Sequence, residues 1–122
     1  MLYFYDTSVI YEYMIDNLNV VPYFEEPNEG KVSLLVIMET YFTLLKKAGE
    51  DAADESLRML FPLMVIPTKT IIREAMKFRL GKEKLGLSYA DALGYVYAKE
   101  HKMPFLTCDS AFKGLPNIIF AR

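Results

Sequence analysis

Four acidic residues stand where local sequence rules do not favour a charge. Glu39 is the only charged residue in the segment LLVIMETYFTLL, and Asp91 opens the apolar segment that continues ALGYVYA. Asp6 and Asp109 each follow a short apolar stretch, in FYDTS and LTCDS. A carboxylate in apolar surroundings is costly unless it is paired, hydrated or bound to a metal. Because Mg²⁺ and Mn²⁺ take carboxylate oxygens, acids gathered around one or two such ions would form a site for phosphoryl transfer.

Each acid also has a simpler explanation. The first and last aspartates could be turn residues, and Asp91 could cap the helix that follows it. Glu39 could pair with Lys46 or Lys69, or reach water. All of these explanations would have to hold together, and the one for Glu39 is the weakest. We therefore favour a shared site for these acids.

The elements that must position the acids alternate between strands and helices. Strands are predicted over residues 1–6, 63–67, 103–107 and 117–120, helices over 8–18, 34–47, 51–61, 68–84 and 88–101, and a loop over 22–30. Ser33 is a plausible N-cap, and Ser88 with Asp91 has the form of a capping box. Strands this apolar predict an α/β protein with a mainly parallel sheet covered by helices. Asp6 would then end the first strand at the carboxyl edge of the sheet, where α/β sheets bind their ligands.

Composition narrows the functional classes. The 122 residues suit one domain, 1–122, and no apolar run approaches the ~18 residues of a membrane span. The N-terminus lacks the features of a signal peptide, so we expect a cytoplasmic protein. The single cysteine, Cys108, excludes an internal disulfide, and with His101 the only other soft ligand a zinc site is not expected. The formal charge of −2 argues against a globally basic nucleic-acid-binding surface.

The order of these motifs resembles that of the PIN-domain ribonucleases, most closely the VapC-like toxins of toxin–antitoxin modules. The sequence has DTS after the first strand, Glu39 in a helix about thirty residues later, S-x-x-D-A at the start of a late helix, and T-x-D after the next strand. The resemblance runs from Asp6 to Asp109, essentially the whole chain. No single motif is specific, but their order, spacing and placement together are.

The resemblance implies a three-layer α/β/α fold with a parallel central sheet, and metal-dependent cleavage of RNA. The residues that match the family's acidic, metal-binding positions are Asp6, Glu39, Asp91 and Asp109. Ser8 and Thr107 match hydroxyl positions that orient these acids or bind water and phosphate. One or two Mg²⁺ or Mn²⁺ ions would lie between the carboxylates, and Glu39 would be either a ligand or the base for the attacking water. The resemblance also implies a homodimer and a small antitoxin partner.

Binding of RNA would need basic or aromatic contacts. Arg73 and Lys77 belong to a row of basic residues at four-residue spacing that starts at Lys69, and Lys113 follows the last of the four acids closely. An ordinary solvated helix face explains the row at least as well. Several tyrosines could stack on bases, although packing is their commoner role: Tyr11, Tyr13, Tyr95 and Tyr97.

Three alternatives differ in chemistry. A PIN nuclease could process RNA without any antitoxin, or a PIN fold could bind a partner without catalysis. A phosphatase of the haloacid-dehalogenase type also begins with an aspartate after its first strand. It needs a second aspartate two residues later, where this chain has Ser8.

Overall fold

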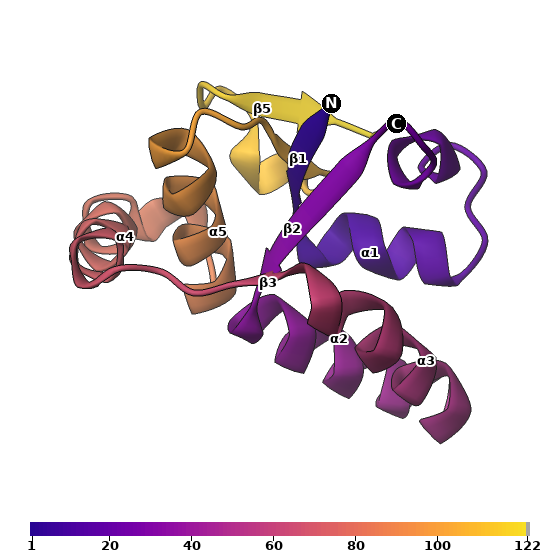
Figure 1. Ribbon diagram of the computed structural model, residues 1–122. Coiled ribbons are helices and arrows are strands. Elements are labelled where there is room, and N and C mark those ends of the chain that lie inside the picture. Colours follow the sequence, from indigo (N-terminus) through magenta and orange to yellow (C-terminus); the bar gives the residue numbers. More distant parts are fainter. Residues whose placement is uncertain (122) are drawn as a thin grey trace.

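The computed structural model describes residues 1–121 (Figure 1). Its strands are β1 (Leu2–Tyr5), β2 (Glu29–Ser33), β3 (Met64–Val65), β4 (Phe105–Thr107) and β5 (Ile118–Phe120). Its helices are α1 (Thr7–Met14), α2 (Leu34–Lys47), α3 (Glu50–Leu60), α4 (Lys69–Gly81) and α5 (Tyr89–Glu100). Short 3₁₀ turns cover Val21–Phe24, Phe61–Leu63, Glu83–Leu85 and Ser110–Phe112.

All strand pairs are parallel, in the order β3-β2-β1-β4-β5. The chain builds the sheet outward from β1 through β2 and β3, then returns to place β4 on the other side of β1. Ligands of α/β proteins bind beyond the carboxyl ends of the strands where the order reverses in this way. Tyr5 is paired with Leu106, so Asp6 and Thr107 follow at the same level of that edge.

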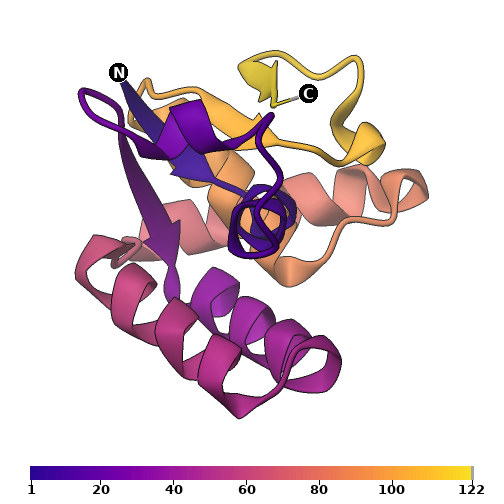
Figure 2. The ribbon, with the colours of Figure 1, turned by 90° about the vertical axis from the view of Figure 1, so that its right-hand side faces the viewer.

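Helices cover both faces of the sheet, with α1 and α5 on opposite sides (Figures 1 and 2). The expected three-layer α/β/α architecture with a parallel sheet is therefore confirmed. Helices α2 and α3 pack against each other, and α2 also contacts α1. Gly94 allows α5 to approach the sheet closely, because a Cβ there would lie 2.5 Å from the Phe4 ring. None of the described helices has the length and apolar character that a bilayer crossing requires.

Strand β2 is the main departure from the sequence prediction, which placed a loop over 22–30 and no strand before the next helix. The segment EGKVS is short, contains glycine and carries two charges, so it lacks the pattern of a buried strand. Pairing with β1 nevertheless orders it from Glu29 to Lys31. Gly30 is essential to this contact, since a Cβ would lie only 1.8 Å from Cε2 of Tyr5. Tertiary packing here overrides local preference.

The predicted helix starts are confirmed, whereas two helix ends were placed too late. Ser33 accepts a hydrogen bond from the Val36 N–H, and both bonds of the capping box at Ser88 are present. Helix α1 ends at Met14 instead of residue 18, and Asp16 then takes a left-handed conformation at φ 64°. Helix α4 ends at Gly81, and the residues predicted to extend it to 84 lie in a 3₁₀ turn.

Helix α2 is less buried than its sequence indicates. Val36, Ile37 and Leu44 face the interior, but Met38 and Phe42 are 58% and 65% exposed. A groove of about 370 Å³ lies over this face of α2 and α3, and almost all of its lining is apolar. It is lined by Leu34, Ile37, Met38, Tyr41, Phe42, Leu45, Leu57 and Phe61. An apolar surface of this kind usually marks a binding face.

Candidate active site

A pocket of about 310 Å³ lies at the carboxyl edge of the sheet. Its lining comes from α1, α2, the start of α5 and the residues after β4, and consists of Asp6, Thr7, Ser8, Tyr11, Glu39, Thr43, Ser88, Asp91 and Asp109. The structure therefore brings the four acids singled out in the sequence to one pocket, although they are spread over more than a hundred residues. We call it the acidic pocket.

Asp6 is the buried member of this group, with only 3% of its surface exposed. It lies between β1 and α1, where its N–H donates to the Leu106 carbonyl at 3.0 Å. Burial, together with the nearby Asp91 carboxyl, raises the pKa of its carboxyl from 3.8 to about 7. Hydrogen bonds from Thr107 and Ser8 oppose this rise in pKa. The site thus holds an acid whose charge is unfavourable without a compensating cation.

Two hydroxyl groups orient the Asp6 carboxylate. Ser8 Oγ donates to Asp6 Oδ2 at 2.8 Å, and Thr107 Oγ1 donates to the same oxygen at 2.7 Å. Each hydroxyl also accepts a backbone N–H, from Cys108 to Ser8 and from Asp109 to Thr107, both at 2.9 Å. Each hydroxyl accepts its backbone N–H through an oxygen lone pair, so its single proton can be donated to Asp6. The network therefore favours the ionised form of Asp6.

Asp91 and Asp109 each serve as a cap and also line the pocket. Asp91 Oδ2 accepts the Ser88 N–H at 2.9 Å, while Ser88 Oγ accepts the Asp91 N–H at 3.0 Å. Asp109 Oδ1 accepts the Ala111 N–H at 2.9 Å. Each cap uses one carboxylate oxygen, so a second oxygen remains for the pocket. The capping explanation and the site explanation are compatible for both residues.

Glu39 lines the acidic pocket and is half-buried, which agrees with the explanation that it reaches water. It is one residue from exposed Met38, and water reaches this part of α2. Among the described residues it forms no ion pair with Lys46 or Lys69; the pairs found are Arg58–Glu55 and Lys77–Glu74. Its position in the acidic pocket is thus not explained by a lysine partner.

Comparison with known proteins identifies the family. Residues 3–117 match the family model described as PIN domain. The chain belongs to the PIN-domain family. No curated protein matches it in sequence. Its membership rests on the family match and agrees with the fold and with the resemblance stated above.

Solved structures share the fold of this PIN domain. VapC20 of Mycobacterium tuberculosis, described as a toxin that cleaves the sarcin–ricin loop, superposes with a TM-score of 0.79 at 15% identity, over 95% of this chain and 96% of that one. A toxin–antitoxin complex from Klebsiella pneumoniae gives 0.75 at 18% identity, over 98% and 97%. VapBC2 from Rickettsia felis, bound to a DNA fragment of its promoter, gives 0.72 at 19% identity, over 98% and 97%.

The donor groups of this PIN domain suit a hard divalent cation. Carboxylate and hydroxyl oxygens line the acidic pocket without any histidine or cysteine, which favours Mg²⁺ or Mn²⁺ over zinc. A cation would reduce the repulsion between the ionised carboxylates of the buried Asp6 and the neighbouring Asp91. Within residues 1–121, however, no three acidic, histidine or cysteine side chains converge closely enough to hold one ion. Binding of one ion by three of these carboxylates would therefore require a change in side-chain conformation.

The basic residues singled out in the sequence lie away from this pocket. Lys113 follows the turn after Asp109 and is exposed, and Arg73 and Lys77 are exposed on α4. None of the three belongs to its lining among the residues described.

Sequence reasoning missed three lining residues, Thr7, Thr43 and Ser88 as a pocket residue, and it named Tyr11 only as a possible base-stacking side chain. Helical spacing was the available signal. Tyr11 lies three positions after Ser8, and Thr43 lies four positions after Glu39, so each shares a helix face with a residue already chosen.

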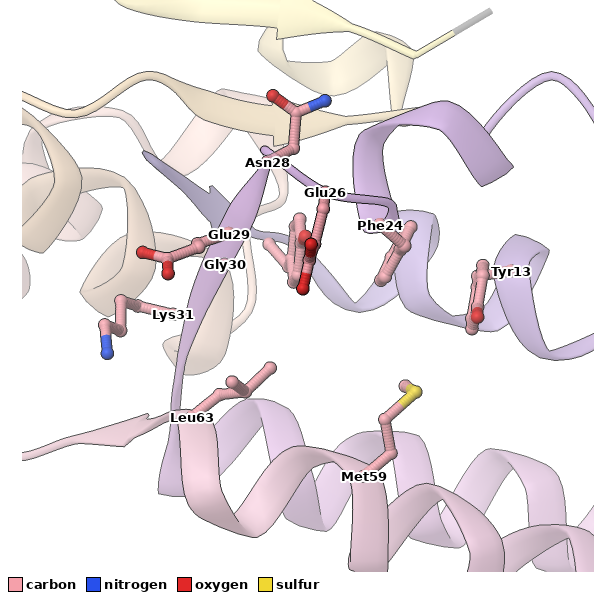
Figure 3. A pocket seen from close by; sticks show the side chains of 10 residues that line it. Tyr13, Phe24, Glu26, Asn28, Glu29, Gly30, Lys31, Met59 and Leu63 are labelled. Atoms are coloured by element: carbon pink, nitrogen blue, oxygen red, sulfur yellow. The ribbon is translucent and has the colours of Figure 1, made fainter. Parts of the chain in front are cut away.

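A larger cavity, of about 450 Å³, lies beside β2 and shares no lining residue with the acidic pocket (Figure 3). The rings of Tyr13 and Phe24 stack along one side with centroids 4.1 Å apart, and Met59 and Leu63 lie across from them. Lys31, Glu26 and Glu29 also line it. It lacks the clustered acids that would support phosphoryl transfer.

Proposed function

We propose that this PIN domain is a metal-dependent ribonuclease that hydrolyses RNA phosphodiester bonds in the cytoplasm with Mg²⁺ or Mn²⁺. The observation that supports it best is the buried Asp6 beside Asp91, in a pocket that Glu39 and Asp109 also line. RNA as the substrate class is suggested by the description of VapC20 as a toxin that cleaves the sarcin–ricin loop.

The residues of the acidic pocket would have different roles in hydrolysis. A bound divalent ion supplies Lewis acidity and a water that loses its proton readily. Asp6 would be the central ligand, held in orientation by Ser8 and Thr107, and Asp91 and Asp109 would offer their remaining oxygens. Glu39 would either complete the ligand set or act as the base for the attacking water.

Cleavage of RNA by the purified protein tests this function directly. We expect single-stranded RNA to be cut with Mg²⁺ or Mn²⁺ and to remain intact with EDTA. RNA that is bound but never cut, with either ion, would instead favour a non-catalytic binding module. Hydrolysis of a phosphomonoester without cleavage of RNA would favour the phosphatase alternative.

Thr107→Val is expected to lower the rate of RNA cleavage about 10- to 100-fold, in the range found for groups that orient a metal ligand. Valine keeps the shape of Thr107 but cannot donate to Asp6 Oδ2 or accept the Asp109 N–H. Steady-state kinetics at several Mn²⁺ concentrations measure the effect, which should be partly recovered at high Mn²⁺. Thr107→Ser, which keeps the hydroxyl and lacks the methyl group, should cleave RNA at close to the wild-type rate. Equal rates for Thr107→Val and wild type would contradict the proposal.

We further propose that the apolar groove on α2 and α3 binds a small antitoxin. Apolar helices commonly dock in grooves of this kind, and the fold is shared with toxins seen in toxin–antitoxin complexes. Met38 and Phe42 of the groove are each followed in sequence by a residue of the acidic pocket, so a segment bound in the groove would lie close to that pocket. Without such a partner, an antitoxin-independent RNA-processing nuclease would be the better description.

Phe42→Asp is expected to prevent this association, because it places a charge in the middle of the groove. Co-expression with the product of a small open reading frame next to the gene should give a complex for wild type and for the control Phe120→Asp, an exposed phenylalanine outside the groove. If the groove instead joins two copies in the homodimer that the family resemblance implies, the protein alone would be dimeric in sedimentation and Phe42→Asp monomeric. If Phe42→Asp still formed both the complex and the homodimer, a role for the groove in association would be contradicted.

A further inference from the structure

We propose that the surface where α1 meets α2, next to the acidic pocket, binds the RNA strand beside the bond that is cut, with Tyr11, Thr43 and Lys47 as its contacts. This inference rests on the proposed function and names the substrate-binding extension of the same site. Tyr11 and Thr43 line the acidic pocket. Lys47 Nζ lies 5.1 Å from the centre of the Tyr11 ring, so a cation is held directly beside that pocket.

The three contacts follow from the geometry of two neighbouring helices. Glu39, Thr43 and Lys47 are spaced by four residues and form one ridge of α2, which spans about 12 Å at the rise of an α-helix. Helix α1 contacts α2 along its side (Figure 1) and contributes Tyr11. The ridge therefore leads from an acid of the pocket to a lysine, with the Tyr11 ring beside the path.

A nearby cation is needed because the walls of the pocket are acidic. A phosphodiester strand brings negative charge to a pocket that already holds four carboxylates, and no lysine or arginine lines it among the described residues. Lys47 is exposed and forms no ion pair within residues 1–121. A cation–π contact at an exposed site is weak, so the ammonium can exchange the ring of Tyr11 for a phosphate.

The other basic side chains are less suited to this role. Lys77 lies 3.8 Å from Glu74, and its helix does not line the acidic pocket. Arg79 forms a similar contact with the Tyr89 ring at 4.3 Å, but its Nε donates to the Leu87 carbonyl and Tyr89 lies outside the pocket lining. Lys47 is thus the cation whose aromatic partner is itself part of the pocket.

Lys47→Ala is expected to weaken binding of a single-stranded RNA oligonucleotide about 5- to 10-fold and to reduce the slope of log affinity against log salt by about one. Lys46→Ala is the matched control, since it removes the same charge from the next position, which lies off the ridge. It should change affinity by less than about twofold. In cleavage assays, Lys47→Ala should raise KM more than it lowers kcat.

Tyr11 provides a second, independent variant. Tyr11→Leu should weaken RNA binding, whereas Tyr11→Phe should retain it, because the ring and not its hydroxyl contacts the lysine. Equal affinities for Lys47→Ala and Lys46→Ala would overturn this inference while leaving RNA cleavage intact. Absence of cleavage by wild type would refute the proposed function, yet the binding titration, which needs no cleavage, would still decide whether this surface binds RNA.

Discussion

Asp6→Asn is expected to lower the rate of RNA cleavage by at least about 100-fold while the fold is retained. Asparagine has nearly the same shape and can still accept from Ser8 and Thr107, but it lacks the negative charge that a divalent ion requires. The expected loss exceeds the 10- to 100-fold typical of residues that only orient a ligand. Single-turnover cleavage of RNA with saturating Mn²⁺ measures it.

Asp51→Asn is the matched control, because that aspartate is exposed in the first turn of α3 and lies outside the acidic pocket. It should cleave RNA at the wild-type rate. The affinity for Mn²⁺, followed by calorimetry, should fall for Asp6→Asn and not for the control. Activity that survives Asp6→Asn at the same level would contradict the assignment and indicate a contaminating nuclease or another site.

That the four acids share a pocket could be predicted from the sequence because charges are unexpected beside such apolar segments. Asp6 follows an apolar strand, and Asp91 lies at the start of a helix whose other residues are mostly buried. The parallel sheet then brings strand ends together, which explains why residues distant in sequence line one pocket. The helix starts were equally accessible, since a serine N-cap acts within three residues.

Features that depend on distant packing could not be predicted in the same way. Strand β2 exists because β1 pairs with it and because Gly30 leaves room for the Tyr5 ring, and neither fact is encoded locally. The sequence also did not indicate which face of α2 is buried, since its apolar residues suit a core and a binding groove equally. Met38 and Phe42 face outward, so Glu39 is partly solvated and Asp6 is the acid that burial affects.

The buried Asp6 predicts that the metal-free protein loses stability as pH rises. Its pKa is about 7 in the folded state and near 3.8 when unfolded, so the folded chain holds a proton that the unfolded chain releases. The contribution of Asp6 to the free energy of unfolding is fully present below about pH 4 and is lost as the pH increases through 7. The loss could reach about 4 kcal/mol, the free energy that corresponds to a pKa of about 7 instead of 3.8.

Comparison of wild type with Asp6→Asn isolates this effect from the other titrating groups. In EDTA, urea unfolding should show the two proteins differing little at pH 4, with Asp6→Asn the more stable by several kcal/mol at pH 8. Mn²⁺ should then reverse the order at pH 8, because it binds the ionised carboxylate and stabilises only the folded wild type. If the stability of the two proteins in EDTA changed with pH in the same way, burial would not destabilise the ionised form of Asp6. A greater stability of Asp6→Asn at pH 8 in EDTA, without any response to Mn²⁺, would confirm that burial destabilises the ionised Asp6 but would remove this residue from the metal site.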